Sequence, residues 1–388
     1  MAPGDNHKFS LEIGSTMKVI HLTRGLGDYV CGLVNAMAQI CETHLVVCGE
    51  DQWIQEFLDP KVKVFQSSAP RVRSLGNIAA IARIARYIAQ VKPDIVHLQS
   101  GLLWELPLTK LFPNVTFVGT IHDVTKHPEY TFRLYPHSLM TQMGNLVKGI
   151  IVHSPRLHVE ASERYKAHAA NKRIFVLPHG VITRYGAGVT SVSPRDGGRI
   201  LLFGGLNKWK GVEYLIKAEP SIRSRMPHAK IRIAGASATP DYHRKLISGE
   251  QNIELSLDRQ SDASVRDLFE WADVIVLPYI QASQSGVLHL GMAFSIPPIV
   301  TSVGGLPDVV MNDRNGLVVE PYDVRGLADA VVRMLSDLDL RKRVIENLTL
   351  EKETTYSWTT IARQTVNIYR HLKANGVSST SPSIGKIA

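Results

Sequence analysis

Short apolar runs alternate with longer amphipathic segments along most of the chain, and this alternation constrains the fold more than any other feature of the sequence. The apolar runs are rich in Val, Ile and Leu, which is typical of strands buried on both faces. Between them, apolar residues recur at helical spacing; Ile78, Ile84 and Ile88, for example, fall on one face of segment 77–91. Strands that alternate with helices predict an α/β fold with a parallel sheet covered by helices on both faces.

The alternation runs through two separate series. We expect strands of the first series at 18–22, 45–47, 62–65, 95–98, 116–121, 149–153 and 174–177, with helices that include 29–40 and 77–91. We expect strands of the second series at 199–203, 230–233, 253–255, 274–277, 298–301 and 316–319, with helices that include 212–218, 263–271, 287–294 and 326–335. A stretch rich in Gly, Ser and Pro separates the two series and reads as a linker.

A chain of 388 residues is long for a single hydrophobic core, so two domains are expected. We predict two doubly wound Rossmann-like domains that face each other across a cleft. The expected segments are an extension at 1–16, a first domain at 17–185, a linker at 186–198, a second domain at 199–356, a C-terminal helix at 357–375 that can pack back on the first domain, and a disordered tail at 376–388.

Charge and composition narrow the class of protein. The net charge is +9, and most of the excess lies in residues 1–190. This charge is compatible with an ordinary basic enzyme, or with a first domain that faces an anionic membrane or a phosphorylated acceptor. No basic run is interleaved with aromatic residues, so we expect no nucleic-acid partner.

The cysteines and the N-terminus indicate the compartment. Cys31, Cys41 and Cys48 lie in apolar surroundings without metal-ligand spacing, which predicts core residues of a reduced compartment. Residues 1–16 lack the apolar core of a signal peptide, and no run approaches the roughly 20 apolar residues of a membrane span. We expect a cytoplasmic protein, or one bound to the inner face of the plasma membrane.

The segment 274–323 carries the clearest prediction of a site. An apolar strand-like run ends at Pro278, a polar loop follows at 281–286, and a helix-like segment leads to the next strand and to the glycine turn Gly304-Gly305. Loop and helix N-terminus therefore meet at the carboxyl edge of a parallel sheet. Helix N-termini at that edge offer free N–H groups and a positive dipole end, so the segment predicts an anion site.

Five features in sequence order resemble the retaining nucleotide-sugar glycosyltransferases of the GT-B fold, in the group called family 4. They are RGLG at 24–27, IHD at 121–123, LPHG at 177–180, LLFGGLNKWKG at 201–211, and the segment 274–323. The last two are the specific ones. QSGV at 284–287, followed by MAF at 292–294 and VGGLP at 303–307, resembles the branch that builds bacterial surface polysaccharides.

The resemblance assigns roles on the donor side of the site. Lys210 matches the lysine that grips the donor diphosphate, whose negative charge grows as the glycosidic bond breaks. Four residues would line the helix N-terminus that faces the phosphates and the sugar: Gln284, Ser285, Gly286 and Val287. A solvated lysine in a loop is the plainer alternative for Lys210.

On the side of the first domain, three residues match family positions. Gly25 and Gly27 would let the first loop approach the donor phosphate or the acceptor closely, unless they only form a tight turn. His122 matches a residue that reaches across the cleft toward the transferred sugar, although a strand-end histidine is often structural. Asp123 could orient its imidazole or cap a turn.

The sequence also departs from the family pattern. Many members carry two glutamates eight residues apart, one of which holds the ribose, whereas this chain has Ala282 and Leu290 at the aligned positions. The usual arginine of the lysine motif is Gly205 here, which leaves open a weaker grip, a substitute cation such as Lys208, or loss of activity. His289 could approach the donor, but a buried structural histidine is the stronger alternative.

The resemblance implies a retaining hexosyltransferase that moves a hexose from a UDP- or GDP-linked donor to a hydroxyl of a glycan, with a lipid-linked acceptor in surface polysaccharide synthesis. No obligatory cofactor or metal is expected. The basic amphipathic segment 77–92, with Arg83 and Arg86, would rest on anionic lipid. The alternatives are a catalytically inactive homologue and an epimerase or phosphorylase of the same fold.

Overall fold

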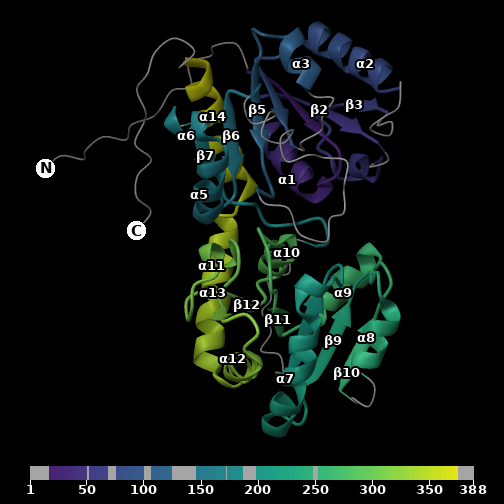
Figure 1. Cartoon of the computed structure of the whole chain (residues 1–388), viewed down its shortest axis with the longest axis vertical. Coiled ribbons are helices and arrows are strands. Elements are labelled where there is room, and N and C mark those ends of the chain that lie inside the picture. Colours follow the sequence, from purple (N-terminus) through teal and green to yellow (C-terminus); the bar gives the residue numbers. More distant parts are fainter. Residues whose placement is uncertain are drawn as a thin grey trace, which may run out of the picture.

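The computed structural model contains two α/β domains, one above the other in Figure 1, with the C-terminal helix α14 alongside the upper one. The structure describes residues 17–49, 52–68, 76–99, 106–124, 146–171, 173–186, 198–247 and 252–374. The expected extension 1–16, most of the expected linker (187–197) and the expected tail 376–388 lie outside these residues. The exact ends of the two domains stay predictions.

The N-terminal domain is built on a seven-stranded parallel sheet with the order β3-β2-β1-β4-β5-β6-β7. Its strands are β1 (Lys18–Thr23), β2 (Glu42–Cys48), β3 (Lys63–Ser67), β4 (Ile95–Leu98), β5 (Thr116–Thr120), β6 (Gly149–Val152) and β7 (Ile174–Val176). Neighbouring residues of a strand point to opposite faces of the sheet. Val19, for example, belongs to the hydrophobic cluster on one face and Ile20 to the cluster on the other. The sheet is therefore buried on both sides, as the apolar runs predict.

Helices cover both faces of this sheet. They are α1 (Gly27–Met37), α2 (Gly76–Val91), α3 (Leu106–Leu111), α5 (Pro155–Arg164) and α6 (Lys166–Ala170), with a 3-10 turn η1 at Gln52–Phe57. Residues of α1 share one cluster with α14, and residues of α2 and α5 belong to the cluster on the opposite face. The order of the strands reverses between β1 and β4, the place where open α/β sheets bind ligands.

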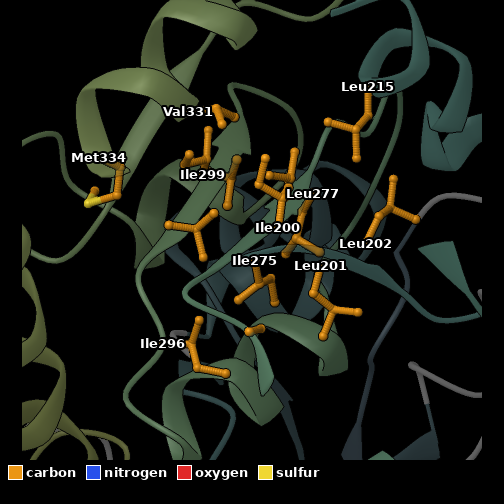
Figure 2. Close-up of a cluster of buried hydrophobic side chains, with 14 of the residues drawn as sticks. Ile200, Leu201, Leu202, Leu215, Ile275, Leu277, Ile296, Ile299, Val331 and Met334 are labelled. Atoms are coloured by element: carbon orange, nitrogen blue, oxygen red, sulfur yellow. The ribbon is translucent and has the colours of Figure 1, made fainter. Parts of the chain in front are cut away.

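The C-terminal domain repeats this plan with six parallel strands in the order β10-β9-β8-β11-β12-β13. They are β8 (Arg199–Phe203), β9 (Lys230–Ala234), β10 (Ile253–Ser256), β11 (Val274–Leu277), β12 (Pro298–Thr301) and β13 (Leu317–Val319). Figure 2 shows the core of this domain, where Ile299 lies beside Val331 of α12 on one side of the central strands, and Ile275 lies on the other side with Leu201 and Ile296. The predicted doubly wound architecture is confirmed in both domains.

The helices of the C-terminal domain surround this sheet. They are α7 (Val212–Arg225), α8 (Pro240–Leu246), α9 (Asp262–Trp271), α10 (Gly286–Ala293), α11 (Leu306–Val309), α12 (Val324–Ser336) and α13 (Leu338–Glu353), with a 3-10 turn η3 at Lys208–Lys210. In Figure 1, α10 lies at the end of this domain that faces the N-terminal domain. The segment around α10 is therefore placed between the two sheets.

Helix α14 (Trp358–Ala374) leaves the C-terminal domain and packs on the N-terminal one. The indole N–H of Trp358 donates to the Val181 carbonyl at 2.7 Å, and the ring occupies the space that side chains on Gly32 and Gly180 would fill. Further along, the Tyr369 hydroxyl lies 2.6 Å from Nδ1 of His97, a buried residue of β4. The C-terminal helix thus joins the two domains by a second connection.

Two expectations about side-chain burial have different outcomes. All three cysteines are buried in the core, as predicted, and no disulfide joins them. In α2, Ile84 and Ile88 are buried against the sheet, but Ile78, which we expected on the same face, is 68% exposed. It precedes Ile84 by six residues, which at 3.6 residues per turn places it about 120° away around the helix. No helix among the described residues has the length and apolar character needed to cross a bilayer.

Candidate functional site

The carboxyl ends of the two sheets meet at a contact between His122 and Gln284. His122 follows β5 of the N-terminal domain, and Gln284 lies in the loop between β11 and α10 of the C-terminal domain. The Gln284 Nε2 atom lies 3.2 Å from His122 Nδ1. Two residues that the sequence predicts from separate motifs are therefore brought together across the domain junction.

Lys210 is held at the end of β11 by the backbone of its own loop. Gly211 has φ 66°, and a Cβ there would lie 1.8 Å from the Pro278 carbonyl oxygen, so only glycine lets the loop approach this closely. The Lys210 ammonium lies 3.8 Å from the ring centre of Tyr279 and 4.4 Å from that of Trp209. The residue is 8% exposed, and no carboxylate of the described residues pairs with it. A buried cation without an acidic partner fits an anionic ligand.

Helix α10 begins next to this lysine. Ser285 is its N-cap, and the Ser285 hydroxyl accepts from the backbone N–H of Leu288 at 3.3 Å. The same oxygen lies 3.2 Å from the Tyr279 hydroxyl. Tyr279 thus contacts both the lysine and the start of the helix, so that a positive charge and the positive end of a helix dipole lie close together.

The glycine turn between β12 and α11 closes against this loop. Gly304 has φ 53°, and a Cβ on it would lie 1.7 Å from the Ala282 carbonyl oxygen. A Cβ on Gly305 would lie 2.9 Å from the Ser154 hydroxyl of the N-terminal domain. Beside it, the Arg156 guanidinium donates to the Gly304 carbonyl at 2.9 Å. The turn needs two glycines because it is wedged between the loop and the other domain.

The two glycines of the first loop have different surroundings. Gly25 has φ 79° and no atom within 4 Å of a Cβ position, so the space beside it is open to a ligand. A Cβ on Gly27 would lie 2.3 Å from the Trp53 ring, so this glycine makes room for an indole. Gly25 therefore leaves free space beside the loop, whereas Gly27 is needed for the packing of Trp53.

Buried aromatic rings surround His122. The Tyr29 ring lies 4.8 Å from that of His122, 5.1 Å from that of His153 and 5.0 Å from that of His179. Burial lowers the pKa of His122 and His179 well below the usual value, and that of His153 to about 4. These imidazoles are therefore neutral at pH 7.

Two polar atoms at this junction have no partner. His122 Nε2 and Gln284 Oε1 are buried and make no hydrogen bond in the structure. Buried polar atoms usually have partners, so an unpartnered pair on opposite sides of one contact points to a ligand. Among the described residues, no cluster of His, Cys, Asp and Glu side chains could hold a metal ion.

The positions that depart from the family pattern are apolar or open. Leu290 is 3% exposed in the core, and Ala282 packs against the same cluster. Gly205 is exposed, with nothing nearer to a Cβ position than Asn207 at 3.8 Å. His289 is 2% exposed, and its ring stacks on that of His179 at 4.5 Å, as a structural histidine would.

Sequence reasoning missed three residues of this region. Tyr279 contacts both Lys210 and Ser285 at the start of α10. His153 contacts His122, and its Nε2 atom lies 3.1 Å from His122 Nδ1. Arg184 donates to Asp28 of α1 at 3.2 Å and to Asp262 of α9, which ties the two domains together. One signal was available: His153 follows β6 as His122 follows β5, and neighbouring parallel strands end at the same edge.

Two family descriptions match the chain, one for each domain. "Glycosyltransferase Family 4" matches residues 23–185, and "Glycosyl transferases group 1" matches residues 197–337. The chain belongs to the GT-B glycosyltransferases. The resemblance stated from the motifs is thereby confirmed at the level of the family.

Curated relatives of this glycosyltransferase chain match over part of their length. An uncharacterized glycosyltransferase of Methanocaldococcus jannaschii is 34% identical over 183 residues, which is 46% of this chain and 47% of that protein. A D-inositol 3-phosphate glycosyltransferase of Corynebacterium glutamicum is 30% identical over 185 residues, 45% of this chain and 44% of that one. The chain thus matches about half the length of these relatives.

Solved structures share the fold over nearly the whole chain. A glycosyltransferase of Rickettsia africae has a TM-score of 0.73 at 20% identity and covers 93% of this chain and 100% of its own. The Anabaena protein HepE, solved in complex with UDP and glucose, has a TM-score of 0.70 at 16% identity and covers 92% of this chain and 100% of its own. At these identities the likeness concerns the GT-B fold.

Proposed function

We propose that the protein is a retaining glycosyltransferase that transfers a hexose from a UDP- or GDP-linked donor to a hydroxyl of a glycan. The observation that carries the proposal is the junction of His122, Gln284 and Lys210. It combines two buried unpartnered polar atoms with a buried cation that has no acidic partner. A nucleotide sugar could supply both kinds of partner: hydroxyls of the sugar for the two polar atoms, and the diphosphate for the lysine.

The chemistry follows from these charges. As the bond between the anomeric carbon and the diphosphate oxygen breaks, negative charge grows on the phosphate. The Lys210 ammonium and the free N–H groups at the start of α10 stabilise that charge. An acceptor hydroxyl forms the new bond from the same face of the sugar, and its proton passes to the leaving phosphate oxygen. Such a front-face reaction requires no carboxylate pair.

We infer a glycan acceptor carried on a lipid, in surface polysaccharide synthesis, because the motif 284–287 resembles that branch of the family. The N-terminal domain would then meet the membrane from the cytoplasmic side through basic residues. Arg86 of α2 is exposed, and Arg83 lies beside Phe65. These residues offer positive charge to anionic lipid.

The test is a thermal-shift screen of the protein against UDP, GDP, ADP and their common sugars, with Lys210→Ala and Lys230→Ala as paired variants. Lys230 is an exposed lysine at the opposite, amino end of the C-terminal sheet. We expect one nucleotide to raise the melting temperature of the parent and of Lys230→Ala but not of Lys210→Ala, because ligands that bind the native state stabilise it. Absence of a shift with every nucleotide would overturn the proposal.

An inactive nucleotide-sugar binder is the second candidate, favoured by Ala282, Leu290 and Gly205. Without a carboxylate at position 290, the ribose lacks the partner that many family members supply. Product analysis separates the candidates. Transfer of labelled sugar with retained anomeric configuration supports the enzyme, whereas a thermal shift without sugar release or transfer supports the binder. Isomerised or phosphorolysed sugar nucleotide would indicate the epimerase or the phosphorylase.

A further inference from the structure

Four groups form a continuous hydrogen-bonded row at the domain junction. His153 Nδ1 lies 3.0 Å from the Leu177 carbonyl oxygen, and His153 Nε2 lies 3.1 Å from His122 Nδ1. His122 Nδ1 also lies 3.2 Å from the Gln284 carboxamide. The row therefore starts at a backbone carbonyl of the N-terminal domain and ends at a side chain of the C-terminal domain.

The carbonyl at the start of the row fixes the protons along it. A carbonyl oxygen can only accept, so His153 Nδ1 must carry the proton. A neutral imidazole has one N–H, so His153 Nε2 presents a lone pair. The Nδ1 atom of His122 faces that lone pair and must donate to it. The remaining atom, His122 Nε2, is then an acceptor.

The same reasoning sets the orientation of Gln284. If its nitrogen faced His122 Nδ1–H, two donors would oppose each other. A half-turn of the carboxamide places its oxygen toward His122 and its NH2 group on the side that has no partner in the structure. If His122 Nδ1 instead accepted from the Gln284 NH2 group, its lone pair would face the lone pair of His153 Nε2.

We propose that His153 is a positioning residue, which holds His122 in the tautomer with the proton on Nδ1 and so offers a lone pair on His122 Nε2 beside an N–H of Gln284. This proposal rests on the proposed function, since the group it would bind is a sugar hydroxyl. A hydroxyl donates one hydrogen bond and accepts others, which matches an acceptor beside a donor. A fluorine or a hydrogen in its place could not donate to His122.

The packing keeps the row in place. His153 is 5% exposed, and the Tyr29 ring lies edge-on against the rings of His122 and His153. Burial lowers the pKa of both imidazoles, so each keeps one proton at pH 7. A half-turn of either ring would put carbon atoms where the hydrogen-bonding nitrogens lie and would break the row.

The first experiment measures the tautomers without any ligand. Two-bond 1H–15N correlation spectra of full-length protein labelled with 15N-histidine distinguish the two neutral forms, and the signals are assigned from single His122→Gln and His153→Gln variants. We expect both residues to be neutral with the proton on Nδ1. A proton on Nε2 of either residue would overturn the proposal whatever the protein binds.

Two variants of His153 then separate positioning from packing. His153→Gln places an amide oxygen where Nε2 stood and can still accept from His122, whereas His153→Asn can reach the Leu177 carbonyl but not His122. We expect His153→Asn to weaken binding of the nucleotide sugar about tenfold, the worth of one hydrogen bond, and to leave binding of the bare nucleotide unchanged. His153→Gln should bind both ligands as the parent does.

The results distinguish the positioning role of His153 from the proposed function on which it rests. Equal losses for the two variants, or equal losses for sugar nucleotide and nucleotide, would refute the positioning role. The predicted tautomers in a protein that binds no nucleotide sugar would leave the row of protons intact and refute the proposed function instead.

Discussion

At the scale of single residues, the glycines of the site serve different purposes. Gly211 and Gly304 are required by the backbone, because each has a positive φ and a Cβ would collide with a carbonyl oxygen. Gly205 has neither constraint, and the space around it is open. The fold therefore does not require glycine at position 205, and the absence of the arginine there only changes the charge of the site.

We predict that Gly205→Arg strengthens the binding of a nucleoside diphosphate about tenfold, because a hydrogen bond to a charged group contributes roughly 1.5–3 kcal/mol. Gly205→Gln is the control, since it adds a side chain without charge. Isothermal titration with the nucleotide found in the thermal screen measures the effect. Equal affinities of the two variants, or a loss with Arg, would contradict the assignment of this position to the diphosphate.

The residues of the site differ in how far sequence could predict them. Lys210 and Gln284 could be predicted because each lies in a motif that follows a strand, and a local sequence pattern marks such a motif. The contact between Gln284 and His122 joins residues far apart in the chain, and its distance depends on how the two domains meet. The position of His153 after the strand beside β5 was the one available signal for it, whereas no local spacing reveals that Tyr279 contacts Lys210 of another loop.

At the scale of elements, the strands were predictable and the helix ends were less so. All strands lie within a few residues of the predicted runs, and in the central strands burial on both faces leaves a continuous apolar signal. Helix α1 begins at Gly27 and not at 29, since its first turn packs under Trp53. Helix α13 was not predicted, and its weakly segregated polar and apolar residues explain why.

Helix α2 carries a prediction about membranes. Its apolar face is used against the sheet through Ile84 and Ile88, so binding to lipid has to rely on its charged face. We expect the double variant Arg83→Gln/Arg86→Gln to lower partitioning onto anionic vesicles about thirtyfold at low salt, because each basic residue near the surface contributes ~1 kcal/mol. Sedimentation with vesicles measures the partitioning.

The control for this prediction is Arg244→Gln, an exposed arginine of α8 in the other domain. Its partitioning should equal that of the parent, and high salt should abolish the difference between parent and double variant. Partitioning that does not depend on salt, or that falls equally in the control, would show that α2 is not the contact.

At the scale of the whole molecule, three connections hold the domains against each other. Helix α14 returns to the N-terminal domain, Arg156 reaches the glycine turn of the C-terminal domain, and Arg184 pairs with acidic residues of both. Between these connections lie the neutral imidazoles of His153 and His289, one from each domain. The junction therefore buries imidazoles that favour the folded state only while they stay neutral.

This arrangement predicts a loss of stability in mild acid. Burial lowers the pKa of His21 and His289 to about 3 and that of His153 to about 4, whereas imidazoles of the unfolded chain titrate near 6.5. Between these values the unfolded chain binds more protons than the folded one. The free energy of unfolding is therefore complete above pH 6.5 and falls as the pH drops, by ~1 kcal/mol per pH unit for each such imidazole.

Urea unfolding between pH 7.5 and 5 measures this loss, in a range that lies above the titration of carboxylates such as Glu42, whose pKa is lowered to about 2. His289→Phe keeps an aromatic ring that can stack on His179 and removes one titrating group. Its stability should fall less steeply than that of the parent, by ~1 kcal/mol per pH unit. Parallel curves for the two proteins would mean that His289 has the same pKa in the folded and the unfolded chain, and would contradict a neutral imidazole buried at the junction.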